Sequence, residues 1–159
     1  QLLKKGNNAY TSKQVSGILG ISRGQLQYWD ETGLLKPSRL PACGSGTIRC
    51  YTFDDIVQLR IIKRLRDEQI SLQKIRKAVD YLQQQIREGR LNLKNPLAEL
   101  SFVTDGNSIY NLSTDKQFAF DLLMSGQIVW YFPIERTVKE VREMETRFFE
   151  DTLSRTGTE

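Results

Sequence analysis

The chain has 159 residues, of which 39% are hydrophobic and 26% are charged, with a formal net charge of +4. This size and composition suit one folded domain or two small ones with a modest core. No apolar run approaches the roughly 20 residues that a membrane-spanning helix needs, and no N-terminal signal pattern is present, so we expect a cytoplasmic protein.

Charge is distributed unevenly along the chain. Residues 1–90 hold 16 Lys or Arg against 8 Asp or Glu, whereas residues 91–159 hold 7 against 11. A basic half followed by an acidic half indicates that the first half meets a polyanion such as a nucleic acid. Generic surface charge is the alternative explanation.

Two short helices are predicted after a polar, flexible lead-in at residues 1–9. Thr11 and Gln14 fit a capping box, and Ser22 and Gln25 repeat the pattern. Gly20 lies between the two helices, where the end of a helix needs left-handed backbone. Helix, tight glycine turn and helix together are the helix-turn-helix signature.

The second of these helices is expected at about residues 23–31, with Leu26 and Trp29 as its apolar pair. Its remaining positions are the residue types that a groove-reading helix uses. Glutamine bonds to an adenine edge, arginine to guanine or phosphate, and a tyrosine hydroxyl to phosphate. The alternative is an ordinary solvated face on a small helical bundle. The candidate DNA-contacting residues here are Ser22, Arg23, Gln25, Gln27 and Tyr28.

A turn-rich segment at residues 41–46 lies between two short extended pieces, the second running from Thr47 to Tyr51. This pattern predicts a two-stranded wing, with Arg39 and Arg49 placed to straddle the sugar–phosphate backbone. The two cysteines, Cys43 and Cys50, cannot complete a four-ligand metal site without a histidine, and the chain has none. Because disulfides are rare in a reducing cytosol, we interpret both as plain small residues and expect no metal or other cofactor, with a disulfide in the wing as the alternative.

Two longer helices follow the wing. Thr52 caps the first, which carries apolar residues at helical spacing and a basic opposite face that includes Arg66. Ser71 caps the next, from Leu72 to about Glu88, with an apolar seam that packs in its own domain or on a second subunit.

Beyond a polar connection at residues 90–95, strands are expected near residues 100–104, 109–112 and 127–132. A short helix is expected at residues 116–125 and a last helix at residues 134–151. Such a unit is small to stand alone, so we expect its aromatic residues to be buried against a second copy. They could instead fill a monomeric core, or line a ligand pocket around Tyr110, Trp130 and Tyr131. The candidate dimer contacts are Trp130, Phe132, Val138, Val141 and Phe148.

Two segments contain the first helix pair, the wing and the second helix pair in this order and spacing. They are TSKQVSGILGISRGQLQYWDETGLLKPSR and TIRCYTFDDIVQLRIIKRLRDEQISLQKIR. They resemble the N-terminal domain of the mercury-resistance-regulator (MerR) family of bacterial transcription factors. Two departures put the base preference in doubt. Gln27 stands where the family often has arginine, and the wing strand keeps Arg49 and Tyr51 but lacks the family's first tyrosine.

The resemblance implies a homodimer that binds a (pseudo)palindromic operator and regulates transcription by distorting promoter DNA, with RNA polymerase as an open further partner. It also implies a phosphate contact at Arg66 and adds Tyr51 to the candidate DNA contacts. An architectural or excisionase-like DNA-binding protein is the alternative, and a protein–protein adaptor role for the acidic half is compatible with either. We do not expect an enzyme, because the chain lacks histidine, a nucleophile elbow, a phosphate loop and a carboxylate pair in one cleft.

The predicted fold class is therefore mainly α. A winged helix-turn-helix DNA-binding domain at residues 10–89 is followed by a small α+β dimerisation or regulatory unit at residues 96–151. A disordered tail is expected at residues 152–159. The dimer contact is expected in the last helix, with the helix at residues 72–88 as the alternative.

Overall fold

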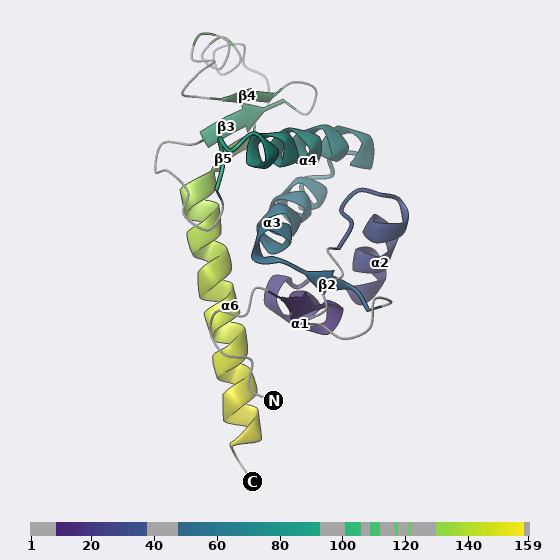
Figure 1. The fold of residues 1–159 in the computed structure, drawn as a ribbon, viewed down its shortest axis with the longest axis vertical. Helices are drawn as coiled ribbons and strands as arrows, with labels where there is room; N and C mark the ends of the chain where they lie inside the picture. The colour runs from purple at the N-terminus through teal and green to yellow at the C-terminus, as the bar shows by residue number, and fades with distance from the viewer. Residues whose placement is uncertain are drawn as a thin grey trace. The chain divides into compact units, whose positions relative to one another are not determined.

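The computed structural model describes residues 9–37, 48–92, 101–105, 109–111, 117, 121 and 130–157. This part is mainly helical and forms two compact units, one with residues up to 59 and from 140 onward, the other with residues 60–139. The helices α3, Phe53–Asp67, and α6, Ile134–Thr156, each contribute to both units (Figure 1).

In the first unit, α1 (Ser12–Leu19) and α2 (Arg23–Glu31) form the helix-turn-helix. The Thr11 hydroxyl accepts a bond from the Gln14 N–H at 3.2 Å, and the Gln14 side chain accepts one from the Thr11 N–H at 2.9 Å. Ser22 and Gln25 make the same reciprocal pair at α2. Gly20 has φ 70°, and its N–H donates to the Ser16 carbonyl at 2.9 Å. Both predicted capping boxes, the glycine turn and the limits of the second helix are confirmed.

A two-residue strand, β1 (Tyr10–Thr11), pairs antiparallel with β2 (Cys50–Tyr51), placing Tyr10 opposite Tyr51 and Thr11 opposite Cys50. The sequence predicted the end of the segment from Thr47 to Tyr51 as half of a two-stranded wing, and it did not predict β1. Two residues are too few to show the alternation that marks a strand. The other predicted wing strand, the tip and Arg39 lie outside the described residues.

Cys50 is fully buried and forms a disulfide, so the interpretation of this residue as a plain small side chain is wrong. The sequence has one other cysteine, Cys43, which lies outside the described residues. That interpretation was based on the reducing conditions of the cytosol, which determine whether a disulfide persists. Those conditions carry no information about whether the fold brings two thiols together.

The core of the first unit is formed by apolar side chains of α1, α2, the loop after α2 and the start of α3. Each large side chain that is fully buried contributes roughly 1.5–3 kcal/mol to stability. These residues are Val15, Ile18, Leu19, Ile21, Leu26, Trp29, Leu34, Leu35, Phe53, Ile56 and Val57.

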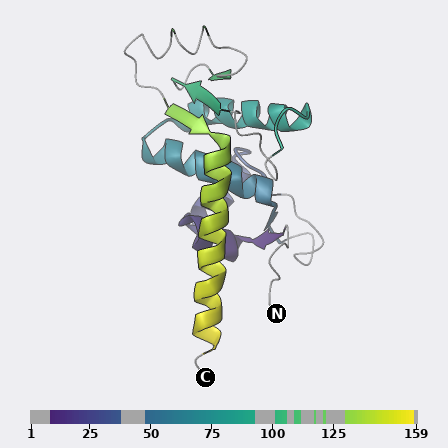
Figure 2. The ribbon, with the colours of Figure 1, turned by 90° about the vertical axis from the view of Figure 1, so that its left-hand side faces the viewer.

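The C-terminal half of α6 packs in this same unit, alongside α1 (Figures 1 and 2). The Tyr10 hydroxyl donates to Glu145 Oε1 at 2.7 Å. The Arg142 guanidinium lies 5.0 Å from the centroid of the Phe53 ring, a cation–π distance. The Phe148 ring lies against Gly17, where a side chain of any size would meet it.

The last helix is longer than the sequence predicted. It ends at Thr156, whereas residues 152–159 were expected to be a disordered tail. The Thr152 hydroxyl donates to the Phe148 carbonyl at 2.9 Å, and that of Thr156 donates to the Thr152 carbonyl at 3.2 Å. Residues 150–157 are all exposed, so the last turns carry no apolar periodicity by which the sequence could reveal a helix.

The second unit contains α4 (Leu72–Arg87) and a three-stranded sheet. Ser71 caps α4, and the predicted seam supplies buried Ile75, Val79 and Leu82. The sheet has the antiparallel order β4-β3-β5, from Ile109–Asn111, Ser101–Thr104 and Trp130–Pro133. Phe102 therefore lies between Asn111 and Phe132. The helix predicted at residues 116–125 lies almost entirely outside the described residues.

We expect the contact between Tyr10 and α6 to weaken at high pH. Burial raises the pKa of Tyr10 well above the ordinary value of 10.0, and the hydrogen bond to Glu145 and its negative charge raise it further, while Arg142 lowers it. The unfolded chain loses this proton near pH 10, whereas the folded chain keeps it. The stability that this group contributes is therefore complete below about pH 10 and declines as the pH rises further.

Wild type and Tyr10→Phe should thus be compared by thermal unfolding between about pH 9 and pH 11. We expect the midpoint of the wild type to fall more steeply, because phenylalanine has no proton to lose. Burial also raises the pKa of Tyr51, and Tyr51 is present in both proteins, so the difference isolates Tyr10. If the unfolding midpoints of the two proteins fall in parallel as the pH rises, the Tyr10 hydroxyl is not held in this protonated state.

Candidate nucleic-acid interface

The helix α2 is held to the first unit by one side and presents a polar face on the other. Leu26, Trp29 and Asp30 are buried. Arg23, Gln25 and Gln27 are exposed on the opposite side, and the Tyr28 side chain is 50% exposed. The side chains that were expected to face a groove are therefore at the surface.

The two glutamines on this face differ in what they bond to. Gln25 is engaged with Ser22 in the capping box, so its carbonyl oxygen is used at the start of α2. Gln27 Nε2 instead donates to Glu31 Oε1 at 2.8 Å, one turn further along the helix. The carbonyl oxygen of Gln27 points away from that bond, because an ionised carboxylate accepts hydrogen bonds and cannot donate them.

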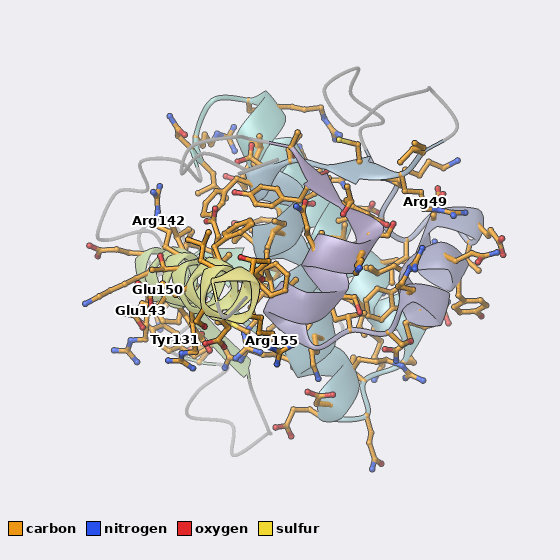
Figure 3. The ribbon with its side chains drawn as sticks, turned by 90° about the horizontal axis from the view of Figure 1, so that it is seen from below. Arg49, Tyr131, Arg142, Glu143, Glu150 and Arg155 are labelled. Carbon is orange, nitrogen blue, oxygen red and sulfur yellow. The ribbon has the colours of Figure 1, made fainter. Side chains whose placement is uncertain are left out.

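Arg49 is fixed to α2 by an ion pair. Its Nε donates to Asp30 Oδ2 at 2.7 Å, with 28% of the Arg49 side chain and 8% of the Asp30 side chain exposed. Figure 3 shows Arg49 beside α2. The pair joins the residue before β2 to a buried position near the C-terminal end of α2. Sequence reasoning placed Arg49 at the backbone of DNA and did not identify Asp30 as its partner, although an aspartate beside Leu26 and Trp29 on an apolar face was a usable signal.

Tyr51 is buried, with 1% of its surface exposed, and its assignment as a DNA contact stays a prediction. Tyr51 lies in β2 opposite Tyr10, so it contributes to the two-stranded sheet. Burial raises the pKa of Tyr51, while the nearby Ser12 hydroxyl and Arg49 lower it. The resemblance placed a tyrosine here, but it carried no information about which way the ring faces.

Comparison with protein families agrees with this geometry. Residues 10–82 match the family of MerR HTH regulatory proteins. This part of the chain belongs to the MerR family. Over 132 residues the chain is also 37% identical to uncharacterised HTH-type transcriptional regulators of Mycobacterium bovis and of two strains of Mycobacterium tuberculosis. That match covers 83% of this chain and 55% of each relative, so the chain spans about half the length of these curated relatives.

Arg66, near the end of α3, is a further cationic candidate in the MerR-family domain. Arg66 is exposed, and its Nη1 donates to the Ile70 carbonyl at 3.0 Å. This bond satisfies a carbonyl just past the C-terminus of the helix, where the helix dipole favours a positive charge. The side chain thus has a structural role, and a phosphate contact by its other donors stays a prediction.

The residues expected to form the dimer contact fall into three groups. Val138 and Val141 are buried within the chain, so they offer no surface to a partner while α6 stays as it is. Phe148 is half-buried against Gly17. The side chains of Trp130 and Phe132 lie outside what the structure describes. A dimer contact through α6 would therefore use the side away from α1, where Glu143 and Glu150 lie (Figure 3).

In the ranges that the structure describes, no helix is both long and apolar enough to cross a membrane. Across the same ranges, no three His, Cys, Asp or Glu side chains gather in a way that could hold a metal ion.

Proposed function

We propose that the MerR-family domain binds double-stranded DNA and that the protein regulates transcription. The observation that carries this proposal is that α2 has one buried side and one exposed polar side. Leu26, Trp29 and the Asp30–Arg49 pair hold one side, so that Arg23, Gln27 and Tyr28 project from the other. The second helix of a helix-turn-helix enters the major groove with such residues in its N-terminal turns.

The charge of the chain supports the same proposal. The MerR-family match lies wholly in the basic half of the sequence, where Lys and Arg outnumber Asp and Glu by 16 to 8. Contacts to phosphate supply most of the affinity of a DNA-binding protein, and contacts to base edges supply its specificity. Arg23 and Tyr28 are suited to phosphate, and Gln27 is suited to a base edge.

The finer proposal is a homodimer that acts in the cytoplasm on a (pseudo)palindromic operator. A helix-turn-helix protein gains from a dimer because two half-sites double its contacts and set their spacing. Part of the specificity would then lie in how easily the promoter DNA between the half-sites deforms. The related mycobacterial proteins, named as transcriptional regulators, support the regulatory role, and RNA polymerase is the further partner that such a role would involve.

The test begins by selecting bound sequences from a random DNA pool with the whole chain. Binding of the selected duplex is then measured by fluorescence anisotropy at several salt concentrations. We expect log Kd to rise with log salt concentration, because bound phosphates release counterions. Arg23→Ala should weaken binding and reduce this slope by about 0.9 for each phosphate contact it removes.

Arg147→Ala is the matched control, because it removes the same charge from an exposed position on α6 of the same unit. It should leave the salt slope unchanged. A slope near zero for the wild type, or a pool in which no sequence is enriched, would end the proposal that this domain binds operator DNA.

A further inference from the structure

One pair on the outward side of α2 has a defined orientation. Gln27 and Glu31 are both exposed, one helical turn apart, and joined by a 2.8 Å hydrogen bond from Nε2 to Oε1. If the Gln27 amide were flipped, its oxygen would face the carboxylate and the bond would be replaced by repulsion. The carboxylate therefore fixes the amide with its Oε1 and its second N–H facing away from Glu31.

The helix that carries the pair is itself held in place. Asp30, between Gln27 and Glu31 in sequence, is buried and bonded to Arg49, while Leu26 and Trp29 are in the core. The outward side of α2 therefore cannot turn without breaking these contacts. A base-reading side chain discriminates well only when the backbone and its rotamer are both restrained.

We propose that Gln27 and Glu31 act as a single specificity-determining pair that selects adenine at one position in each half-site. This inference rests on the proposed function, DNA binding by α2. In the major groove, adenine offers an amino donor at N6 beside an acceptor at N7. The Gln27 Oε1 accepts from N6, and its second N–H donates to N7.

The carboxylate of Glu31 adds discrimination against the other bases. Guanine presents two acceptors, N7 and O6, and thymine presents O4 and a methyl group. The N7 of guanine can still accept from the second N–H of Gln27. The O6 of guanine or the O4 of thymine, however, would face Gln27 Oε1 and the negative charge of Glu31, and neither of those groups donates a proton. Cytosine offers only the N4 amino group and makes one bond where adenine makes two.

The experiment measures the Kd of the whole chain for the selected duplex and for versions with guanine, thymine or cytosine at the position assigned to Gln27. For the wild type we expect adenine to be preferred over guanine by at least about fivefold. Glu31→Gln and Gln27→Ala should each reduce that ratio toward one. The ratio compares two duplexes with one protein preparation, so a loss of folded protein does not change it.

The chain offers a matched control in α4, where Gln84 Nε2 donates to Glu88 Oε1 at 2.9 Å in the same arrangement. Glu88→Gln removes the same charge from the same kind of pair, so it should leave the adenine-to-guanine ratio unaltered. A wild type that selects a defined site but prefers guanine or thymine there overturns the inference. So does a ratio that Glu31→Gln leaves intact. A wild type that selects no site at all contradicts the proposed function instead.

Discussion

Replacing Arg49 with methionine is expected to lower the free energy of unfolding by about 2 kcal/mol, as measured by urea denaturation. Methionine keeps much of the aliphatic stem but removes the guanidinium that bonds to Asp30, whose side chain is 8% exposed. A buried carboxylate that loses such a partner keeps its desolvation cost. The effect should fall below that of a fully buried pair, because Arg49 is 28% exposed and water screens part of the interaction.

A double-mutant cycle distinguishes the ion pair from general packing. Asp30→Asn keeps the size of the side chain and removes its charge. It leaves an arginine whose side chain is 28% exposed and can be solvated by water, so it should cost less, about 1 kcal/mol. In the Asp30→Asn background, Arg49→Met should cost less than in the wild type, since no buried charge remains. If the costs of the two single substitutions add up to the cost of the double substitution within about 0.5 kcal/mol, the two side chains are not coupled.

Replacing Gly17 with alanine is expected to destabilise the protein by about 1–2 kcal/mol, against the usual effect of alanine in a helix. In an ordinary helix interior, alanine is more favourable than glycine by up to about 1 kcal/mol. Here a Cβ at position 17 would overlap the Phe148 ring, so α6 or its side chain must move away from α1. Thermal or urea unfolding of Gly17→Ala shows whether the substitution lowers or raises the free energy of unfolding.

Two companion variants make this result specific. Gly24→Ala in α2 is the matched control, because a Cβ there would meet only the Ser22 hydroxyl oxygen at 4.0 Å, and it should be neutral or stabilising. In a Phe148→Ala background, Gly17→Ala should change sign and stabilise the helix. If Gly17→Ala stabilises the wild type as well, Phe148 does not rest on α1.

Part of the candidate site could be predicted from the sequence, and part could not. That Arg23, Gln27 and Tyr28 lie at the surface was predictable, because Leu26 and Trp29 define the buried side of a nine-residue helix. The burial of Tyr51 and the tie between Arg49 and Asp30 were not. Both depend on which residues the rest of the chain brings beside them, and a residue type alone does not carry that information.

The sequence by itself determined the helices that begin with a cap and end at a glycine. The capping boxes at Thr11 and Ser22 and the left-handed turn at Gly20 each form within four residues, so the local sequence contains all the atoms involved. The same holds for the cap of α4 at Ser71.

Only the tertiary structure decided how these elements are joined. The Arg49–Asp30 pair links residues 19 positions apart, and the Tyr10–Glu145 bond links residues 135 positions apart. The pairing of β1 with β2 and the packing of Phe148 on Gly17 are equally distant in sequence. Such contacts leave no periodic pattern in either partner, because each depends on a surface that exists only once the chain has folded.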